Sequence, residues 1–230
     1  MNFIVKNIKK NKLSFKILSG AVHKNMPPII HKTIITIRYL FFKRFCFKNN
    51  PSVFKYSDGS WVNRETTKDL LRIQSYLSSE SASIKVMQAG IGNSSLFRAV
   101  IDRIDKLVGI TIVPEEIEYA KTNFPNDFGK KYEIWFTNKY SANLEWLGKD
   151  FDFIVDNDIS SYACCKQHFR DMLTAYRMLL APNGKIMIGK NGLGYFDNGF
   201  GLTETLAKKI FMDAGFTFTK TKFGYQLKII

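Results

Sequence analysis

Short apolar runs alternate with segments of helical periodicity along most of the chain. The runs that predict strands are Ile84–Met87, Leu107–Ile110, Tyr132–Thr137, Phe151–Val155 and Lys185–Gly189. The segments that predict helices are 63–79, 93–100, 114–123, 166–180 and 202–214, and two further strand-like runs, 216–222 and 225–230, close the chain. This alternation predicts an α/β three-layer sandwich, in which helices cover both faces of a mostly parallel seven-stranded sheet that ends in an antiparallel hairpin.

Turn and cap residues set the ends of these elements. Asn63 is placed to cap the first helix, because Glu65 and Asp69 then lie near its N-terminal end. Pro114 suits the first position of a helix, and Gly215 suits the residue after one. Ligands of such sheets bind at the carboxyl ends of the strands, so we expect the chemistry in the loops that follow them.

The positive charge of the protein is concentrated at one end. The 230 residues carry a net charge of +14, and 11 of the 34 Lys and Arg lie in residues 1–50, which contain no Asp or Glu. Residues 51–230 are therefore nearly neutral, and Asn49-Asn50-Pro51 marks a break between the two parts. We predict a basic N-terminal arm, 1–50, followed by one domain, 51–230, and we expect no nucleic-acid partner.

Lys and Arg alternate with Ile, Leu and Phe within the arm, over 29–47. This pattern is typical of a segment that lies on an anionic membrane surface, although plain packing against the domain or a lid over the substrate site is the explanation that we favour. No apolar run reaches 18 residues, and no signal peptide is recognisable. We expect a cytoplasmic protein, with peripheral membrane attachment through the arm left open.

The three cysteines and three histidines predict neither a metal site nor a disulfide framework. Cys46, Cys164 and Cys165 form no CxxC pair, and the histidines are scattered. An odd, partly clustered set of cysteines in a chain of this length favours a reducing compartment. We therefore expect no metal cofactor.

A glycine-rich loop follows the first predicted strand. It reads Gln88-Ala89-Gly90-Ile91-Gly92-Asn93-Ser94 and leads into a helix. Glycines at this place let the backbone approach a ligand, and the free N–H groups of a helix start attract an anion. The motif alone is weak, but its position between a strand and a helix is the one that a nucleotide-like cofactor requires.

Five segments in order resemble those of class I S-adenosylmethionine-dependent methyltransferases. They are the glycine loop within 86–95, LVGITIVPEEIEYA at 107–120, FDFIVDND at 151–158, MLLAPNGKIMIG at 178–189, and the closing AGF with its hairpin. The resemblance covers about 60–230. It implies a Rossmann-like fold, S-adenosylmethionine as cofactor and S-adenosylhomocysteine as product.

Three positions depart from the usual pattern of this family. It usually has an acid where this chain has Gln88 and Thr111, and a glycine where this chain has Ser94. In one branch, which includes the cyclopropane synthases, a residue at the position of Glu116 helps to hold the cofactor. The resemblance therefore implies that Glu116 accepts from the ribose and that Asn138 meets the adenine amino group.

Carried over position by position, the resemblance implies a set of cofactor contacts. They are Gln88, Gly90, Gly92, Asn93, Ser94, Thr111, Ile112, Glu116, Asn138, Asp156 and Asn157. A nicotinamide dinucleotide fits less well, because it requires a third glycine in the loop and an acid at the end of the second strand.

The remaining candidates concern the acceptor. Asp158 or His168 suits proton removal from a hydroxyl group, with Tyr162 as an alternative. The residues expected to contact the acceptor are Trp61, Tyr162, Tyr195 and Asp197, of which the last two lie in a glycine-rich loop at 192–201. The sequence after the fourth strand lacks the prolines typical of enzymes that methylate the amino groups of nucleobases or glutamine.

The sequence thus predicts S-adenosylmethionine-dependent methyl transfer to an oxygen atom of a small-molecule, saccharide or lipid-linked acceptor. Two alternatives stay open. One is a binding module with this fold and no catalysis, motivated by Gln88 and Thr111, and the other is a different transfer from the same cofactor, such as aminopropyl transfer. The oligomeric state is not indicated.

The charge of the arm generates a first prediction. The full chain is expected to sediment with phosphatidylserine-containing vesicles at low salt and to be released by salt, because each surface Lys or Arg contributes roughly 1 kcal/mol of attraction. A chain without residues 1–50 serves as the control and should stay in the supernatant. Absence of binding by the full chain at every salt concentration would refute membrane attachment.

Overall fold

The computed structural model describes residues 33, 59–80, 83–141, 144–163, 165–193 and 201–230. The predicted arm, 1–50, lies outside this part of the chain except for Thr33, so the arm and the boundary at residue 51 stay predictions. No helix among the described residues combines the length and apolar character needed to cross a membrane.

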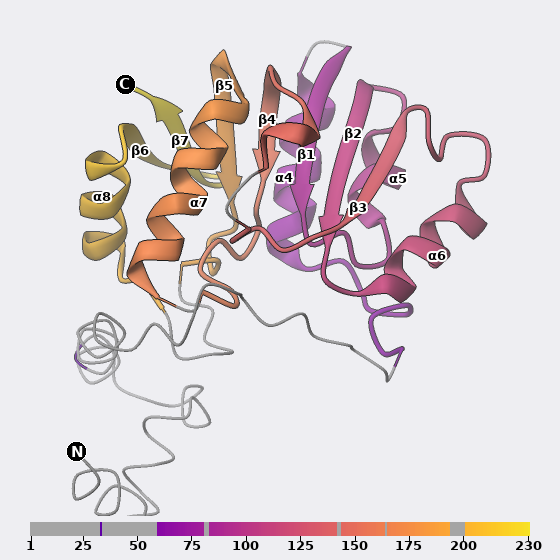
Figure 1. Cartoon of the computed structure of the whole chain (residues 1–230), viewed down its shortest axis with the longest axis horizontal. Coiled ribbons are helices and arrows are strands. Elements are labelled where there is room, and N and C mark those ends of the chain that lie inside the picture. The colour runs from indigo at the N-terminus through magenta and orange to yellow at the C-terminus, as the bar shows by residue number, and fades with distance from the viewer. Residues whose placement is uncertain (1–32, 34–58, 81–82, 142–143, 164, 194–200) are drawn as a thin grey trace, which may run out of the picture.

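Seven strands form a single sheet (Figure 1). They are β1 (Ile84–Ala89), β2 (Ile104–Thr111), β3 (Tyr132–Phe136), β4 (Phe151–Val155), β5 (Leu180–Ile188), β6 (Phe216–Thr221) and β7 (Gly224–Ile229). Their order is β3-β2-β1-β4-β5-β7-β6, and β7 runs antiparallel to both of its neighbours while the other pairs are parallel. The predicted parallel sheet with a closing hairpin is confirmed.

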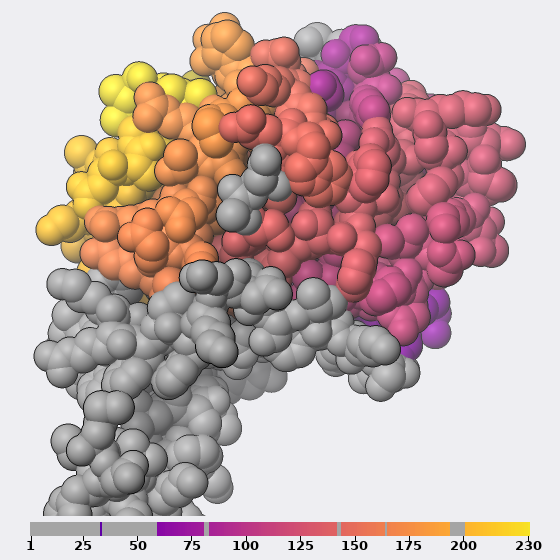
Figure 2. All heavy atoms as spheres, viewed as in Figure 1, coloured from indigo at the N-terminus to yellow at the C-terminus, as the bar shows by residue number. Residues whose placement is uncertain are grey.

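Helices cover both faces of the sheet. They are α4 (Lys68–Ser79), α5 (Ser95–Val100), α6 (Pro114–Asn123), α7 (Lys166–Leu179) and α8 (Glu204–Asp213), with a short 3₁₀ helix η1 (Glu145–Leu147). Helices α4, α5 and α6 pack in one apolar cluster, and α7, α8 and η1 pack in the other. In the space-filling view, the orange and yellow residues from α7 onward lie on one side of the visible face and the pink residues of α6 lie on the other (Figure 2).

The two clusters explain why the strands read as continuous apolar runs. Along β4, Phe153 and Val155 belong to the cluster of α4 to α6, whereas Ile154 between them belongs to the cluster of α7 and α8. Neighbouring side chains of a strand point to opposite faces, so a strand covered on both sides is apolar at every position.

Two predicted element starts were wrong by at least four residues. Helix α4 begins at Lys68 rather than after Asn63, because the Thr67 hydroxyl accepts the Leu70 N–H at 3.2 Å and caps the helix there. Strand β5 begins at Leu180, before Pro182-Asn183-Gly184 rather than after it. Residues 64–67 are therefore not helical, and they line the cavity described below.

The loops after β4 and β5 lie backbone to backbone. The Gly189 N–H donates to the main-chain oxygen of Asn157 at 3.0 Å, and a Cβ atom built on Gly192 would lie 1.9 Å from the same oxygen. The Ser160 hydroxyl adds bonds to the main-chain oxygens of Gly192 and Leu193, both at 3.1 Å. No side chain fits between these two loops at residue 192.

This contact predicts a large cost for the Gly192→Ala substitution. The added methyl group would force the two loops apart, and the free energy of unfolding should fall by about 3 kcal/mol. Gly129→Ala is the control, because its Cβ would meet nothing within 4 Å and only its positive φ of 78° matters, which costs roughly 1 kcal/mol. Urea unfolding of both variants checks this, and equal losses would contradict the backbone contact.

Candidate functional site

A cavity opens where the strand order reverses, between β1 and β4. It has a volume of about 290 Å³, near the lower end for small-molecule sites. Its walls are the loops that follow β1, β2, β3 and β4, together with residues 61–70 before and within α4. All four loops leave the same edge of the sheet, so side chains from distant parts of the sequence meet here.

The glycine loop forms the floor of the cavity. Gly90 and Gly92 have φ values of 78° and 52°, a backbone conformation that favours glycine. The Gly90 N–H is bound to the main-chain oxygen of Ile110 at 2.8 Å, which closes the end of β1 onto β2. The Asn93 side chain donates to the main-chain oxygens of Val62 and Arg64, at 3.2 and 3.0 Å. Asn93 thereby ties the segment before α4 to the glycine loop.

Glu116 brings a carboxylate to the end of β2. One of its oxygens accepts the Thr111 hydroxyl at 2.6 Å and the Gly92 N–H at 3.1 Å. Burial raises the pKa of this carboxyl, and the bonds from Thr111 and Gly92 oppose that rise. An acid from helix α6 thus stands beside Thr111. The end of strand β2 carries no acid at this position.

Two buried side-chain oxygens of the cavity wall have no hydrogen-bond partner among the described residues. They are Gln88 Oε1, at the end of β1, and Asn157 Oδ1, after β4. The Gln88 amide nitrogen donates to the main-chain oxygen of Gly90 at 2.9 Å, which fixes the orientation of the amide. Buried acceptors are normally paired, so Gln88 Oε1 is suited to a ligand that donates a hydrogen bond. Asn157 Oδ1 lies against Gly189, where an added Cβ would come within 2.4 Å of it.

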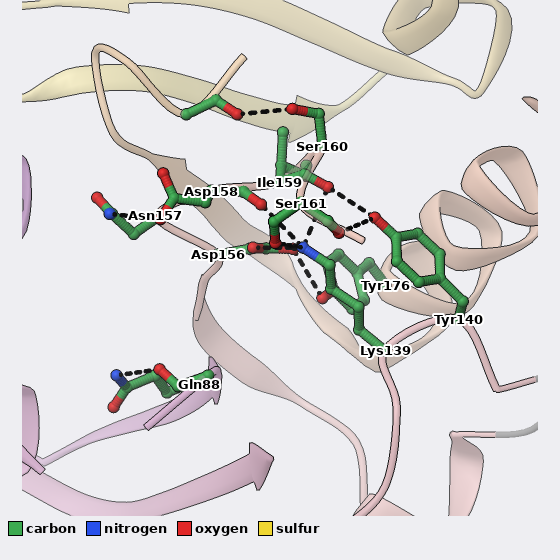
Figure 3. Close-up of polar contacts among 12 residues, drawn as sticks. Gln88, Lys139, Tyr140, Asp156, Asn157, Asp158, Ile159, Ser160, Ser161 and Tyr176 are labelled. Atoms are coloured by element: carbon green, nitrogen blue, oxygen red, sulfur yellow. Dashed lines mark hydrogen bonds and ion pairs between the residues drawn. The ribbon is translucent and has the colours of Figure 1, made fainter. Parts of the chain in front are cut away.

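A buried ammonium group organises the loop after β4 (Figure 3). Lys139 Nζ lies 3.0 Å from both carboxylate oxygens of Asp156 and also contacts the main-chain oxygens of Asp158 and Ile159, at 2.9 and 3.1 Å. The Tyr176 hydroxyl donates to the same Asp156 carboxylate at 3.0 Å, and burial keeps the pKa of this phenol well above its usual value. Asp156 is therefore fully engaged within the protein.

Asp158 carries the other carboxyl of this loop. It lines the cavity, and Asn157 donates a hydrogen bond to it at 3.3 Å. Burial, with the nearby charge of Asp156, raises the pKa of Asp158 to about 6, although Lys139 acts in the opposite direction. A carboxyl with this pKa exchanges its proton near neutral pH, as a general base must.

The arrangement of strands, loops and cavity can be compared with known proteins. No family model matches the sequence, and no curated protein matches it either. A TehB-like S-adenosylmethionine-dependent methyltransferase from Corynebacterium glutamicum superposes with a TM-score of 0.55 at 14% identity, over 73% of this chain and 90% of that chain. The N-methyltransferase NodS from Bradyrhizobium japonicum, in complex with S-adenosylhomocysteine, gives 0.55 at 17% identity, over 84% and 98%.

A third structure agrees with these two. The 1,6-didemethyltoxoflavin-N1-methyltransferase from Burkholderia thailandensis, with its acceptor and S-adenosylhomocysteine bound, gives a TM-score of 0.54 at 16% identity, over 90% of this chain and 91% of that chain. The chain has the class I methyltransferase fold. The Rossmann-like architecture that the sequence motifs imply is thereby confirmed.

In this methyltransferase fold, most residues predicted at the site do line the cavity. From the predicted cofactor set these are Gln88, Gly90, Gly92, Asn93, Thr111, Ile112, Glu116, Asn138, Asp156 and Asn157, and from the acceptor set Trp61, Asp158 and Tyr162. Asn138 and Trp61 are both buried, and the side-chain oxygen of Asn138 accepts the Tyr140 N–H at 3.0 Å. That these residues bind a ligand stays a prediction.

Two predicted residues lie elsewhere in the described structure. Ser94 has the left-handed φ of 58° and is fully buried, and its hydroxyl accepts the Tyr132 hydroxyl at 2.9 Å rather than facing the cavity. His168 lies in the first turn of α7, where its Nδ1 is 3.3 Å from the sulfur of Cys165, and it is not among the described residues lining the cavity. Tyr195 and Asp197 fall outside the described residues.

The sequence reading missed Lys139, Tyr140 and Arg64, which also line the cavity. Lys139 follows Asn138 directly, but nothing in its surroundings along the chain marks it as buried. Within the described part of the chain, no group of three His, Cys, Asp or Glu side chains gathers as a metal site would require.

The raised pKa of Asp158 predicts how stability depends on pH. An acid whose pKa is higher in the folded protein contributes stability at low pH that is lost as the pH rises from about 4 through about 6. Asp158→Asn should therefore raise the free energy of unfolding at pH 7.5 by on the order of 2 kcal/mol, and by little at pH 4.

Urea unfolding at four pH values between 4 and 7.5 measures this difference. Asp102→Asn is the control, since this residue is exposed and its substitution should change stability by less than about 0.5 kcal/mol at every pH. A gain for Asp158→Asn that does not change with pH would contradict the electrostatic cause.

Proposed function

We propose that the protein binds S-adenosylmethionine in this cavity and transfers its methyl group to an oxygen atom of a small-molecule, saccharide or lipid-linked acceptor. The observation that carries the proposal is the position of the Glu116 carboxylate, which the Thr111 hydroxyl and the Gly92 N–H hold at the end of β2. A carboxylate at this place suits the two ribose hydroxyls of the cofactor, because it can accept from both.

The other walls of the cavity fit the remaining groups of this cofactor. Gln88 Oε1 is a buried acceptor without a partner in the described structure, and the cofactor carries an ammonium group that donates. Ile112 and Asn138 offer an apolar and an amide group for the adenine. When bound, the cofactor supplies an electrophilic methyl group on a sulfonium leaving group, and the task of the protein is alignment.

Asp158 is the residue that we assign to proton removal from the acceptor. It lines the cavity and its pKa is about 6, so it is largely ionised at neutral pH and can accept a proton from a hydroxyl group. Asp156 is less suited, because Lys139 and Tyr176 already engage its carboxylate. The structural neighbours named above include N-methyltransferases, so amines belong in the acceptor screen alongside alcohols.

A binding module without catalysis is the second candidate. Gln88 favours it, because a neutral amide stands where the resemblance implies an acid, and an amide attracts an ammonium group less than a carboxylate does. Aminopropyl transfer from the same cofactor would differ from methyl transfer only in its product, which mass spectrometry of the acceptor distinguishes.

Calorimetric titration of the full chain with S-adenosylmethionine, S-adenosylhomocysteine and NAD tests the proposal. We expect the two sulfur compounds to bind in the micromolar range and NAD not to bind. Binding of neither sulfur compound by folded protein would contradict the cofactor assignment. Binding without transfer to any acceptor in a broad screen would favour the binding module.

Substitution of Glu116 tests the carboxylate directly. Glu116→Gln keeps the size of the side chain but removes its charge, so the affinity for S-adenosylhomocysteine should fall by about tenfold, which corresponds to the loss of one charge-assisted hydrogen bond. Glu118→Gln is the matched control, because Glu118 is an exposed residue of the same helix that pairs with Lys121. Equal affinities of the two variants for S-adenosylhomocysteine would mean that the Glu116 carboxylate does not contribute to binding.

A further inference from the structure

The cavity wall contains one buried cation, Lys139, that no motif marks. Its side chain is 9% exposed, and its Nζ lies within 3.2 Å of five oxygen atoms. Two belong to the Asp156 carboxylate, two are the main-chain oxygens of Asp158 and Ile159, and one is the Ser161 hydroxyl. Burying an ammonium group is costly unless each N–H finds an acceptor, and this site provides them.

All five oxygens belong to one segment, residues 156–161, which follows β4. Lys139 itself belongs to the loop after β3, and β3 and β4 are separated in the sheet by β2 and β1. The pairing of strands therefore does not bring these two loops together. The ammonium group joins them, as its central position among the residues of the loop after β4 in Figure 3 shows.

Tyr140 strengthens the same connection. Its hydroxyl lies 2.7 Å from the main-chain oxygen of Ser161 and 3.2 Å from that of Ile159. Two consecutive residues of one loop thus hold the main chain of the other at three carbonyl groups. This segment carries Asp158. The next residue after the segment, Tyr162, has a φ of 56° and also lines the cavity.

We propose that Lys139 is a positioning residue, whose ammonium group fixes the main chain of residues 156–161 and thereby holds Asp158 at the acceptor end of the cavity. That this end receives an acceptor rests on the proposed function, whereas the fixing of the loop is a property of the protein without any ligand. The two statements can therefore fail separately.

Hydrogen exchange of the full chain, measured residue by residue without ligand, tests the fixing of the loop. In Lys139→Met the amides of Ser160, Ser161 and Ala163, which are bonded within or next to this segment, should exchange at least about tenfold faster than in the wild type. The amides of β4 should keep their rates. Lys220→Met is the control, because it removes an exposed pair between Lys220 of β6 and Glu204 of α8 and should change neither set.

A purely stabilising ion pair would give a different result. Loss of global stability accelerates the amides of β4 and of the loop by the same factor, so equal acceleration would overturn the proposal, as would unchanged loop rates. If Lys139→Met does not fold because Asp156 is left unpaired, the double variant Lys139→Met/Asp156→Asn removes both charges. Fast loop exchange in that variant supports the proposal, and wild-type protection overturns it.

Titration of the Asp158 carboxyl by carbon NMR provides a readout that belongs to position rather than stability. Burial raises the pKa of Asp158 more than Lys139 lowers it. Release of the loop in Lys139→Met should therefore bring the carboxyl into water and lower its pKa, whereas loss of the Lys139 charge with the loop still in place should raise it. A lower pKa in the variant supports the proposal, and a higher or unchanged pKa overturns it. If the wild type fails to bind S-adenosylhomocysteine while these effects appear, the function is wrong and the positioning stands.

Discussion

The reversal of strand order between β1 and β4 is the constraint on which the site depends. These two strands are neighbours, yet the helices that follow them, α5 and α7, pack on opposite faces of the sheet. The chain must therefore leave the ends of β1 and β4 in opposite directions, and a space between the two loops is unavoidable. The loops that line the cavity reach this space because of that divergence.

The chemistry of this space depends on how the protein compensates its buried acids, that is, on the hydrogen bonds and ion pairs that offset the cost of burying each carboxylate. Glu116 is compensated by a hydroxyl and a backbone N–H, and Asp156 by Lys139 and a phenol. Asp158 is compensated least, since among the described residues only the Asn157 side-chain amide donates a hydrogen bond to it. A group that remains energetically unfavourable in the folded protein is typical of a functional position, because a well-packed neutral side chain would be more stable there.

The sequence predicted the sheet well because parallel strands buried on both faces are apolar throughout. The start of α4 was misplaced because Asn63 and Thr67 are both good caps, and only the three-dimensional structure decides which side chain reaches a free N–H. The loops of the site could be located, since topology places strand ends together. The contact of Lys139 with Asp156 could not be predicted, because it joins loops whose strands are not neighbours. Ser94 was assigned to the ligand from its place in the glycine loop, but a side chain at its φ of 58° points into the core.

The backbone contact of Asn157 with Gly189 and Gly192 has a consequence for how such a protein can diversify. Without space for a side chain at residue 192, neither loop can change its path alone, and the pair acts as a fixed frame at the end of β4 and β5. Under the proposed function, new acceptor preferences would then arise where side chains project from that frame, at positions such as Asp158 and Tyr162, with the path of the frame unchanged. The same rigidity that limits variation at the glycines would let single substitutions beside them alter selectivity without loss of the fold.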